Sequence, residues 1–140
     1  MSKLDKQKII RKINMIKDDL KLLKKVAPKS FEDYKDNIEV QLEVERLLEK
    51  IIGRMIDINY HILKHEHEII PVDYKASFIK MRMEYKNKDI FEKIANSASL
   101  RNVLIHEYEE IDNRKVYNSI NLALTQVPRY LKAVVDIFEY

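Results

Sequence analysis

The fold is decided by residues 44–62, which read VERLLEKIIGRMIDINYHI. Apolar side chains recur in this stretch at alternating spacings of four and three positions: Val44, Leu48, Ile51, Met55, Ile58 and Ile62. Because an α-helix turns by about 100° per residue, this spacing places them in one stripe along one side of a helix. The stretch therefore predicts a long amphipathic helix that forms one wall of a hydrophobic core.

Two further segments carry the same spacing, and no segment alternates with the period of two that is typical of a strand. The first segment contributes Ile9, Ile13, Ile16, Leu20, Leu23 and Ala27 and stops at Pro28; the second contributes Ile120, Leu124, Val127, Leu131, Val134 and Phe138. Pro128 lies inside the second segment, where its missing backbone donor predicts a kink. We therefore predict an all-α fold, an antiparallel bundle of three long helices and a shorter helical pair, in a single domain over residues 1–140.

Capping residues and prolines set the predicted helix boundaries. Ser30 with Asp33 resembles a capping box, so we expect the central helix to open there and to end near Lys64. The other expected elements are a loop over 65–73, a helix capped by Asp73 and ending near Tyr85, a polar link at 86–88, a helical run over 89–106, a turn over 109–113 and a last helix from about Arg114.

The composition excludes several classes of function. The chain of 140 residues contains one Gly and no Cys. Phosphate-cradling loops and dinucleotide-binding turns need several glycines, so Walker-type nucleotide chemistry is not expected. The absence of cysteine excludes disulfides and thiolate catalysis.

Hydropathy and charge bear on location and partners. No apolar run approaches the roughly 18 to 20 residues that cross a bilayer, and the N-terminus lacks the apolar core of a signal peptide, so we expect a cytoplasmic protein without a membrane partner. Residues 1–28 hold nine Lys or Arg and three Asp. A basic helix of this kind favours contact with a polyanion, and the alternative is a solvated lysine-rich face.

Three residues on the central helix have the spacing of metal ligands. Asp57, His61 and His65 follow one another at four-residue intervals, which aligns them on one helix face. The di-metal pattern of helical bundles requires Glu-x-x-His pairs, which this chain lacks, so we favour solvated histidines and expect neither a metal nor another cofactor. Gly53 lies on the same face. A glycine inside a helix permits the close approach of another backbone, and the alternative is that it arose by sequence drift and has no packing role.

The strongest group of polar residues is the stretch SLRNVLIHEY, residues 99–108. In a helix, Leu100, Val103 and Leu104 would face the core, whereas Arg101, Asn102, Ile105, His106 and Tyr108 would point elsewhere. An apolar Ile105 among polar groups, opposite the internal stripe, is what a homodimer interface would need.

The chemistry available to this stretch is limited. A histidine moves protons near neutral pH, an arginine holds a phosphate, and Asn102 can orient either group. Cleavage of RNA by its own 2′-hydroxyl needs only such groups, and a two-fold dimer would bring a second His106 and a second Arg101 into one cleft. The alternative is that Arg101 and His106 merely stabilise the C-terminus of a helix.

The pattern Arg101-x4-His106-x-Tyr108 resembles the Arg-x4-His-x-Tyr motif of the HEPN superfamily. More specifically, it is similar to HepT-type toxins, which are paired with a minimal nucleotidyltransferase, MntA, in toxin–antitoxin modules. The similarity covers most of the chain from Val44 to Leu131, including the helix around residues 45–61 and the segment 74–78.

This resemblance implies a homodimer with a metal-independent endoribonuclease site that acts on RNA. Arg101 and His106 would be catalytic, Asn102 would support them, and Tyr108 would be the hydroxyl that the MntA-like antitoxin modifies with AMP. Glu109-Glu110 departs from the expected pattern by adding negative charge near the RNA path. The alternative is a non-catalytic subunit that binds a nucleotide or docks to a nucleotidyltransferase and regulates it.

Overall fold

The computed structural model describes residues 4–106 and 111–138, and it confirms the all-α fold. The described residues form no strand, and their helices are α1 (Lys6–Val26), α2 (Phe31–Lys35), α3 (Ile38–His67), α4 (Tyr74–Glu84), α5 (Ile90–Lys93), α6 (Ser97–His106) and α7 (Asn113–Phe138). None of these helices is long and apolar enough to cross a bilayer. Tyr108, which the motif singles out, lies outside the described residues.

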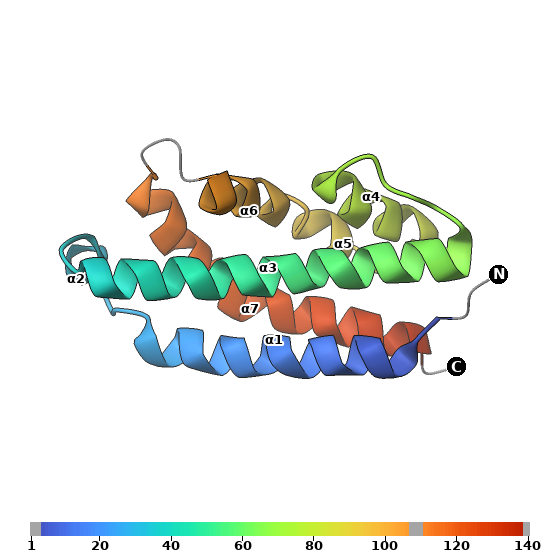
Figure 1. Cartoon of the computed structure of the whole chain (residues 1–140), viewed down its shortest axis with the longest axis horizontal. Coiled ribbons are helices and arrows are strands. Elements are labelled where there is room, and N and C mark those ends of the chain that lie inside the picture. The colour runs from blue at the N-terminus through green and yellow to red at the C-terminus, as the bar shows by residue number, and fades with distance from the viewer. Residues whose placement is uncertain (1–3, 107–110, 139–140) are drawn as a thin grey trace.

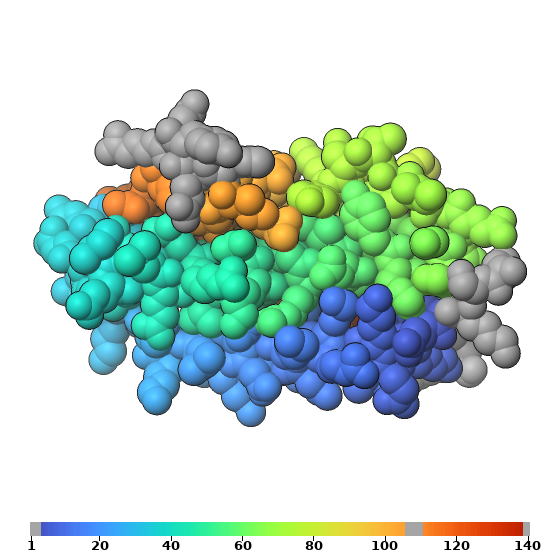
Figure 2. Space-filling model, in the orientation of Figure 1, coloured from blue at the N-terminus to red at the C-terminus, as the bar shows by residue number. Residues whose placement is uncertain are grey.

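The three long helices α1, α3 and α7 pack together, α4 and α6 pack along another side of α3, and α5 packs against α4 and α7 (Figure 1). Helix α1 runs opposite to α3, as an antiparallel bundle requires, and both ends of the chain lie at the same end of the molecule. Helices α4 to α6 carry the chain back along α3, so α7 runs in the same direction as α3. Figure 2 shows one broad face built from α1, α3 and α4.

The core contains most of the stripes that the sequence predicts, although three of their members are only partly buried: Ala27, Leu124 and Phe138. The central stripe of α3 is buried throughout, and the stripes of α1 and α7 pack against it. Several polar groups inside the core are paired with one another: the Tyr130 hydroxyl donates to Asn59 Oδ1 at 2.6 Å, and Asn59 Nδ2 donates to Ser77 Oγ at 3.1 Å, whereas the buried Tyr34 hydroxyl has no partner among the described residues. This chain of hydrogen bonds joins α7, α3 and α4. It stabilises the core, because a buried polar group without a partner would cost free energy.

An ion cluster joins α1 to α3. The buried carboxylate of Asp19 accepts from Lys50 Nζ at 3.3 Å and from Arg54. Both cations come from α3, on either side of Ile51 to Gly53 in the sequence. The cluster therefore fixes α1 beside the part of α3 that carries Gly53.

The beginning of the central helix differs from the prediction. Ser30 does accept a hydrogen bond from the Asp33 amide, at 3.2 Å, but it caps the short α2. Asn37 then opens α3 by accepting from the Val40 amide at 3.1 Å. The side-chain amide of Gln41 donates through Nε2 to the carbonyls of Tyr34 and Lys35, which satisfies the end of α2 and stabilises the break.

Two other boundaries were wrong. Helix α3 continues past Lys64 to His67, where Glu68 adopts a left-handed conformation with φ of 56° and closes the last turn. The helical run over 89–106 is divided into α5 and α6 by a turn at 94–96. The helix capped by Asp73 is confirmed as α4, and α7 continues on both sides of Pro128.

Candidate active site

Arg101 on α6 packs directly over Gly53 on α3. A Cβ atom placed on Gly53 would lie 2.9 Å from Arg101 Nε, 3.2 Å from Nη2 and 3.4 Å from Cζ. Because Gly53 has no side chain, the Arg101 guanidinium packs directly against α3. The close approach predicted at Gly53 does occur, but the partner is a side chain and not another backbone.

A second contact holds the guanidinium from α4. Arg101 Cζ lies 5.2 Å from the centroid of the Tyr74 ring, within the range of a cation–π interaction. Tyr74 is the first residue of α4, and Asp73 fixes that helix start by accepting from the Ala76 amide at 2.7 Å. The Tyr74 ring in turn meets the Tyr60 ring, edge to face, at 6.4 Å between centroids.

The charge of Arg101 is not neutralised within the described part of the chain. Its Nε atom is buried and lacks a hydrogen-bond partner there, and no carboxylate of the described residues forms an ion pair with it. A guanidinium is a planar donor that matches the geometry of a phosphate. The site is thus a half-buried cation, held in place by α3 and α4, with donors available for an anion.

Asn102 and His106, two further residues of the motif, lie on the same helix. Asn102 is exposed on α6, and His106 is the last residue of that helix, five positions after Arg101. The structure does not describe the His106 side chain, and Tyr108 lies outside the described residues. Asn102 therefore follows Arg101 on α6, and the helix carries the backbone of His106 to its end.

The orientation of α6 differs from the prediction in two respects. Leu104 is buried and Leu100 is half-buried, as expected, but Val103 is 51% exposed. Arg101 does not point away from the bundle but faces α3. The reason is that α6 packs through Ala98, Arg101 and Leu104, which recur at three-residue spacing, and only the glycine on α3 makes room for Arg101 in that row.

The three residues with metal-ligand spacing make other contacts. Asp57 forms an ion pair with Lys12 at 3.2 Å, and His61 Nε2 accepts a hydrogen bond from the Asp5 amide at 3.0 Å. The rings of His61 and His65 lie 4.3 Å apart between centroids. Within residues 4–106 and 111–138, no three His, Asp or Glu side chains are grouped as a metal ion would require.

Comparison with known proteins identifies the family. The family model of proteins described as "Ribonuclease HepT-like" matches residues 16–134. This chain belongs to the HepT-like ribonuclease family. The match includes both Gly53 and Arg101, and it spans all of α3 to α6.

A curated relative of this HepT-like chain is the "tRNA nuclease HepT" of Aphanizomenon flos-aquae (strain 2012/KM1/D3). The two sequences are 34% identical over 135 residues, which is 96% of this chain and 92% of the relative. The family that the motif suggested is therefore confirmed for almost the whole length of the chain.

Two residues of this HepT-like site were not found from the sequence. Tyr74 was placed in a segment similar to the family but received no role, and Tyr60 was placed only within the similar helix. Each lies far from Arg101 in the sequence, and only the packing of α4 against α3 and α6 brings them together. The single glycine inside a long helix was the available signal, since it marked where a bulky group approaches.

Proposed function

We propose that this HepT-like chain is an endoribonuclease whose active site contains Arg101 and His106, with Asn102 in a supporting role. The observation that carries the proposal is the Arg101 guanidinium, seated between Gly53 and Tyr74 without an ion-pair partner in the described structure. Such a cation stabilises the extra negative charge of a pentacoordinate phosphorus and costs little reorganisation, because α3 and α4 already hold it.

The proposed reaction is attack by the RNA 2′-hydroxyl on the adjacent phosphorus. A neutral His106 removes the proton from the 2′-oxygen as that oxygen bonds to phosphorus. The bond to the 5′-oxygen then breaks, and a protonated histidine donates its proton to that leaving oxygen. The products are a 2′,3′-cyclic phosphate and a 5′-hydroxyl, and Arg101 binds the non-bridging oxygens throughout.

The two proton-transfer roles favour a homodimer. Each copy offers one His106, so a second copy would supply the second histidine in a shared cleft. Exposed apolar side chains on either side of the buried Leu104 support this arrangement, since Val103 is 51% exposed and Ile105 is 40% exposed. Exposed apolar groups beside a polar site are suited to self-association.

We also propose that a MntA-like nucleotidyltransferase antitoxin neutralises the enzyme by transferring AMP to Tyr108. The added group carries a phosphate, and Tyr108 follows Arg101 by seven residues in the sequence. The AMP phosphate would compete with RNA for the Arg101 guanidinium. A toxin–antitoxin module of this type would place both proteins in the cytoplasm.

The proposal is tested by RNA cleavage in excess EDTA. Since the relative is named a tRNA nuclease, tRNA is the first substrate to use. We expect cleavage by the unaltered protein and a loss of at least about 100-fold in Arg101→Ala and in His106→Ala. Arg129→Ala, which removes an exposed arginine from α7, is the matched control and should retain activity.

The outcomes separate the candidate functions. Folded protein that never cuts RNA but binds a nucleotidyltransferase would favour the docking subunit. Equal cleavage by all variants would place the active site elsewhere. Cleavage that stops in EDTA would contradict the metal-independent mechanism.

A further inference from the structure

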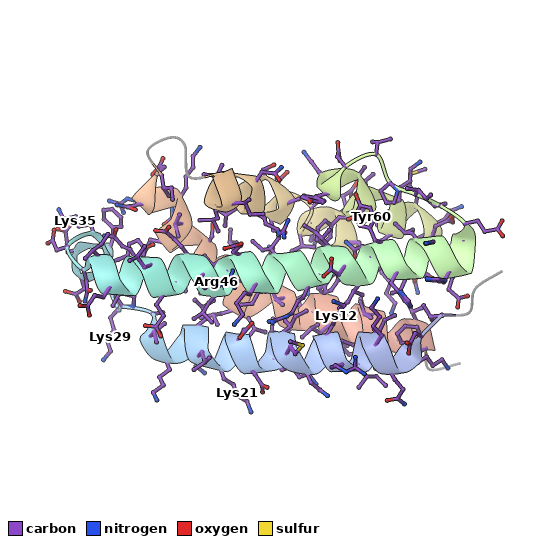
Figure 3. The ribbon with its side chains drawn as sticks, viewed as in Figure 1. Lys12, Lys21, Lys29, Lys35, Arg46 and Tyr60 are labelled. Atoms are coloured by element: carbon purple, nitrogen blue, oxygen red, sulfur yellow. The ribbon has the colours of Figure 1, made fainter. Side chains whose placement is uncertain are left out.

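A basic depression lies where the N-terminal half of α1 meets the C-terminal half of α3. It has a volume of about 550 Å³ and is lined by Lys8 and Lys12 of α1, by Asp57, Tyr60, His61, Lys64 and His65 of α3, and by Ile69 and Ile70. Figure 2 shows these two helix halves side by side, in dark blue and green. Figure 3 shows Lys12 between α1 and α3, and Tyr60 on the side of α3 that faces α4.

The depression has an excess of positive charge. Its only lining carboxylate among the described residues, Asp57, is already paired with Lys12 at 3.2 Å. The ammonium groups of Lys8 and Lys64 form no ion pair in that part of the chain, although both line the depression. Two lysines without a counter-ion at one hollow are suited to an anion.

The pKa of His61 is consistent with this positive charge. Burial lowers the pKa of His61 below its ordinary value, and the neighbouring His65, Lys8 and Lys12 lower it further, against the opposing effect of Asp5. His61 is also held as an acceptor by the Asp5 amide. An anion that entered the depression would reduce this unfavourable concentration of positive charge.

The depression is connected to Arg101 along one face of α3. Gly53, Asp57, Tyr60, His61 and Lys64 recur at spacings of three and four and so share that face. Tyr60 lines the depression and contacts Tyr74, and Tyr74 contacts Arg101. Cations interleaved with aromatic rings are typical of surfaces that bind single-stranded nucleic acid, since the cations bind phosphates and the rings stack on bases.

We infer that this depression binds a backbone phosphate of the same RNA strand that Arg101 contacts, through Lys8 and Lys64, with Tyr60 and Tyr74 between the two phosphate positions. The inference rests on the proposed ribonuclease function and extends it to the path of the substrate. Gly53 and Lys64 are separated by about 16 Å along α3, which corresponds to about two to five nucleotides of a single strand.

The test measures binding to RNA that cannot be cut. A 2′-O-methyl oligonucleotide of roughly ten residues lacks the attacking hydroxyl, so the unaltered protein can be compared with a Lys8→Gln/Lys64→Gln variant by fluorescence anisotropy. We expect the variant to bind about 5- to 30-fold more weakly at low salt, and its plot of log K against log salt to be flatter by about 0.7, the change that corresponds to one lost phosphate contact. A 2′-O-methyl dinucleotide has a single phosphodiester and cannot occupy both phosphate positions at once, so its affinity should differ less between the two proteins than that of the longer strand.

The matched control is Lys24→Gln/Lys25→Gln, which removes the same charge from exposed positions at the other end of α1. Unchanged affinity in the Lys8/Lys64 variant would overturn the inference, and so would an equal loss in the control, because the effect would then come from net charge alone. A variant that binds RNA normally but no longer binds a nucleotidyltransferase would identify the depression as a protein-docking surface and also overturn it. Failure of the unaltered protein to cleave RNA would contradict the proposed function without affecting this binding measurement.

Discussion

The guanidinium of Arg101 lies where the side chain of residue 53 would be if that residue were not glycine. A Cβ atom there would come within 2.9 Å of Arg101 Nε. Glycine in the middle of a helix costs about 1 kcal/mol relative to alanine, so α3 gives up stability at the point where it seats the arginine. A substitution of Gly53 by a residue with a side chain should therefore change stability and activity in opposite directions.

Gly53→Ala tests that relationship. The new methyl group would push the end of the Arg101 side chain aside, because a flexible side chain moves more easily than two packed helices. We expect RNA cleavage to fall by about 10- to 100-fold, since a misplacement of about 1 Å has effects of this size. The free energy of unfolding should rise by about 0.5–1 kcal/mol, as measured by urea denaturation. A Gly53→Ala protein that is both stable and fully active would show that Arg101 does not need the space that Gly53 leaves.

Tyr74 is expected to act as a positioning residue for Arg101. Tyr74→Leu removes the ring that lies 5.2 Å from the guanidinium and should lower kcat by about 2- to 30-fold, as the loss of about 0.5–2 kcal/mol predicts. Tyr74→Phe keeps the ring and should restore most of the activity. Equal losses in the two variants would instead assign the effect to the hydroxyl group.

Asp19 should be important for stability and not for catalysis. Asp19→Ala would leave Lys50 and Arg54 partly buried without their shared anion, and we expect the free energy of unfolding to fall by about 3–5 kcal/mol. Asp18→Ala removes the neighbouring exposed carboxylate and is the control, with an expected change within about 0.5 kcal/mol. Similar values for the two variants would contradict the role of the cluster.

His61 should make the folded state less stable in acid. Its pKa in the folded protein lies below the ordinary value of 6.5, chiefly because of burial, so the unfolded chain binds a proton more readily. Its contribution to stability is complete above about pH 6.5 and is lost as the pH falls through the range between the unfolded and folded pKa values. Protonation of Nε2 would also break the hydrogen bond from the Asp5 amide.

The measurement is chemical denaturation of the unaltered protein and of His61→Gln from about pH 8 to about pH 5. The difference in unfolding free energy between the two proteins should shrink on acidification. A difference that stays constant over this range would show that His61 does not titrate with folding.

Tyr108→Phe should prevent transfer of AMP by the partner nucleotidyltransferase and leave most of the RNA cleavage. It removes the proposed acceptor hydroxyl while keeping the aromatic ring. Tyr117→Phe is the control on α7, where the native hydroxyl donates to the Pro28 carbonyl at 3.4 Å. Peptide mass spectrometry would locate the AMP, and its presence chiefly on Tyr117 would contradict the assignment.

The sequence by itself determined the helices that build the core. The four-and-three spacing of Ile, Leu, Val and Met residues specifies which side of α1, α3 and α7 is buried, because a helix has one fixed rotation per residue. Local capping was also readable, since Asp73 and Ser30 bind amides three residues ahead. The Arg101 motif was found in the same way, because its residues are close in the sequence.

Only the tertiary structure decided what surrounds that motif. Whether Ser30 opens a short helix or a long one depended on the contacts of Gln41 with the end of α2. The rotation of α6, which exposes Val103 and turns Arg101 toward Gly53, depended on the shape of α3 opposite it. The periodicity of apolar residues predicts which side of a helix is buried. The final rotation of the helix about its axis depends on packing between residues that are distant in the sequence. The same packing brings Tyr74, Tyr60 and the lysines of α1 to one face of α3, which no local pattern encodes.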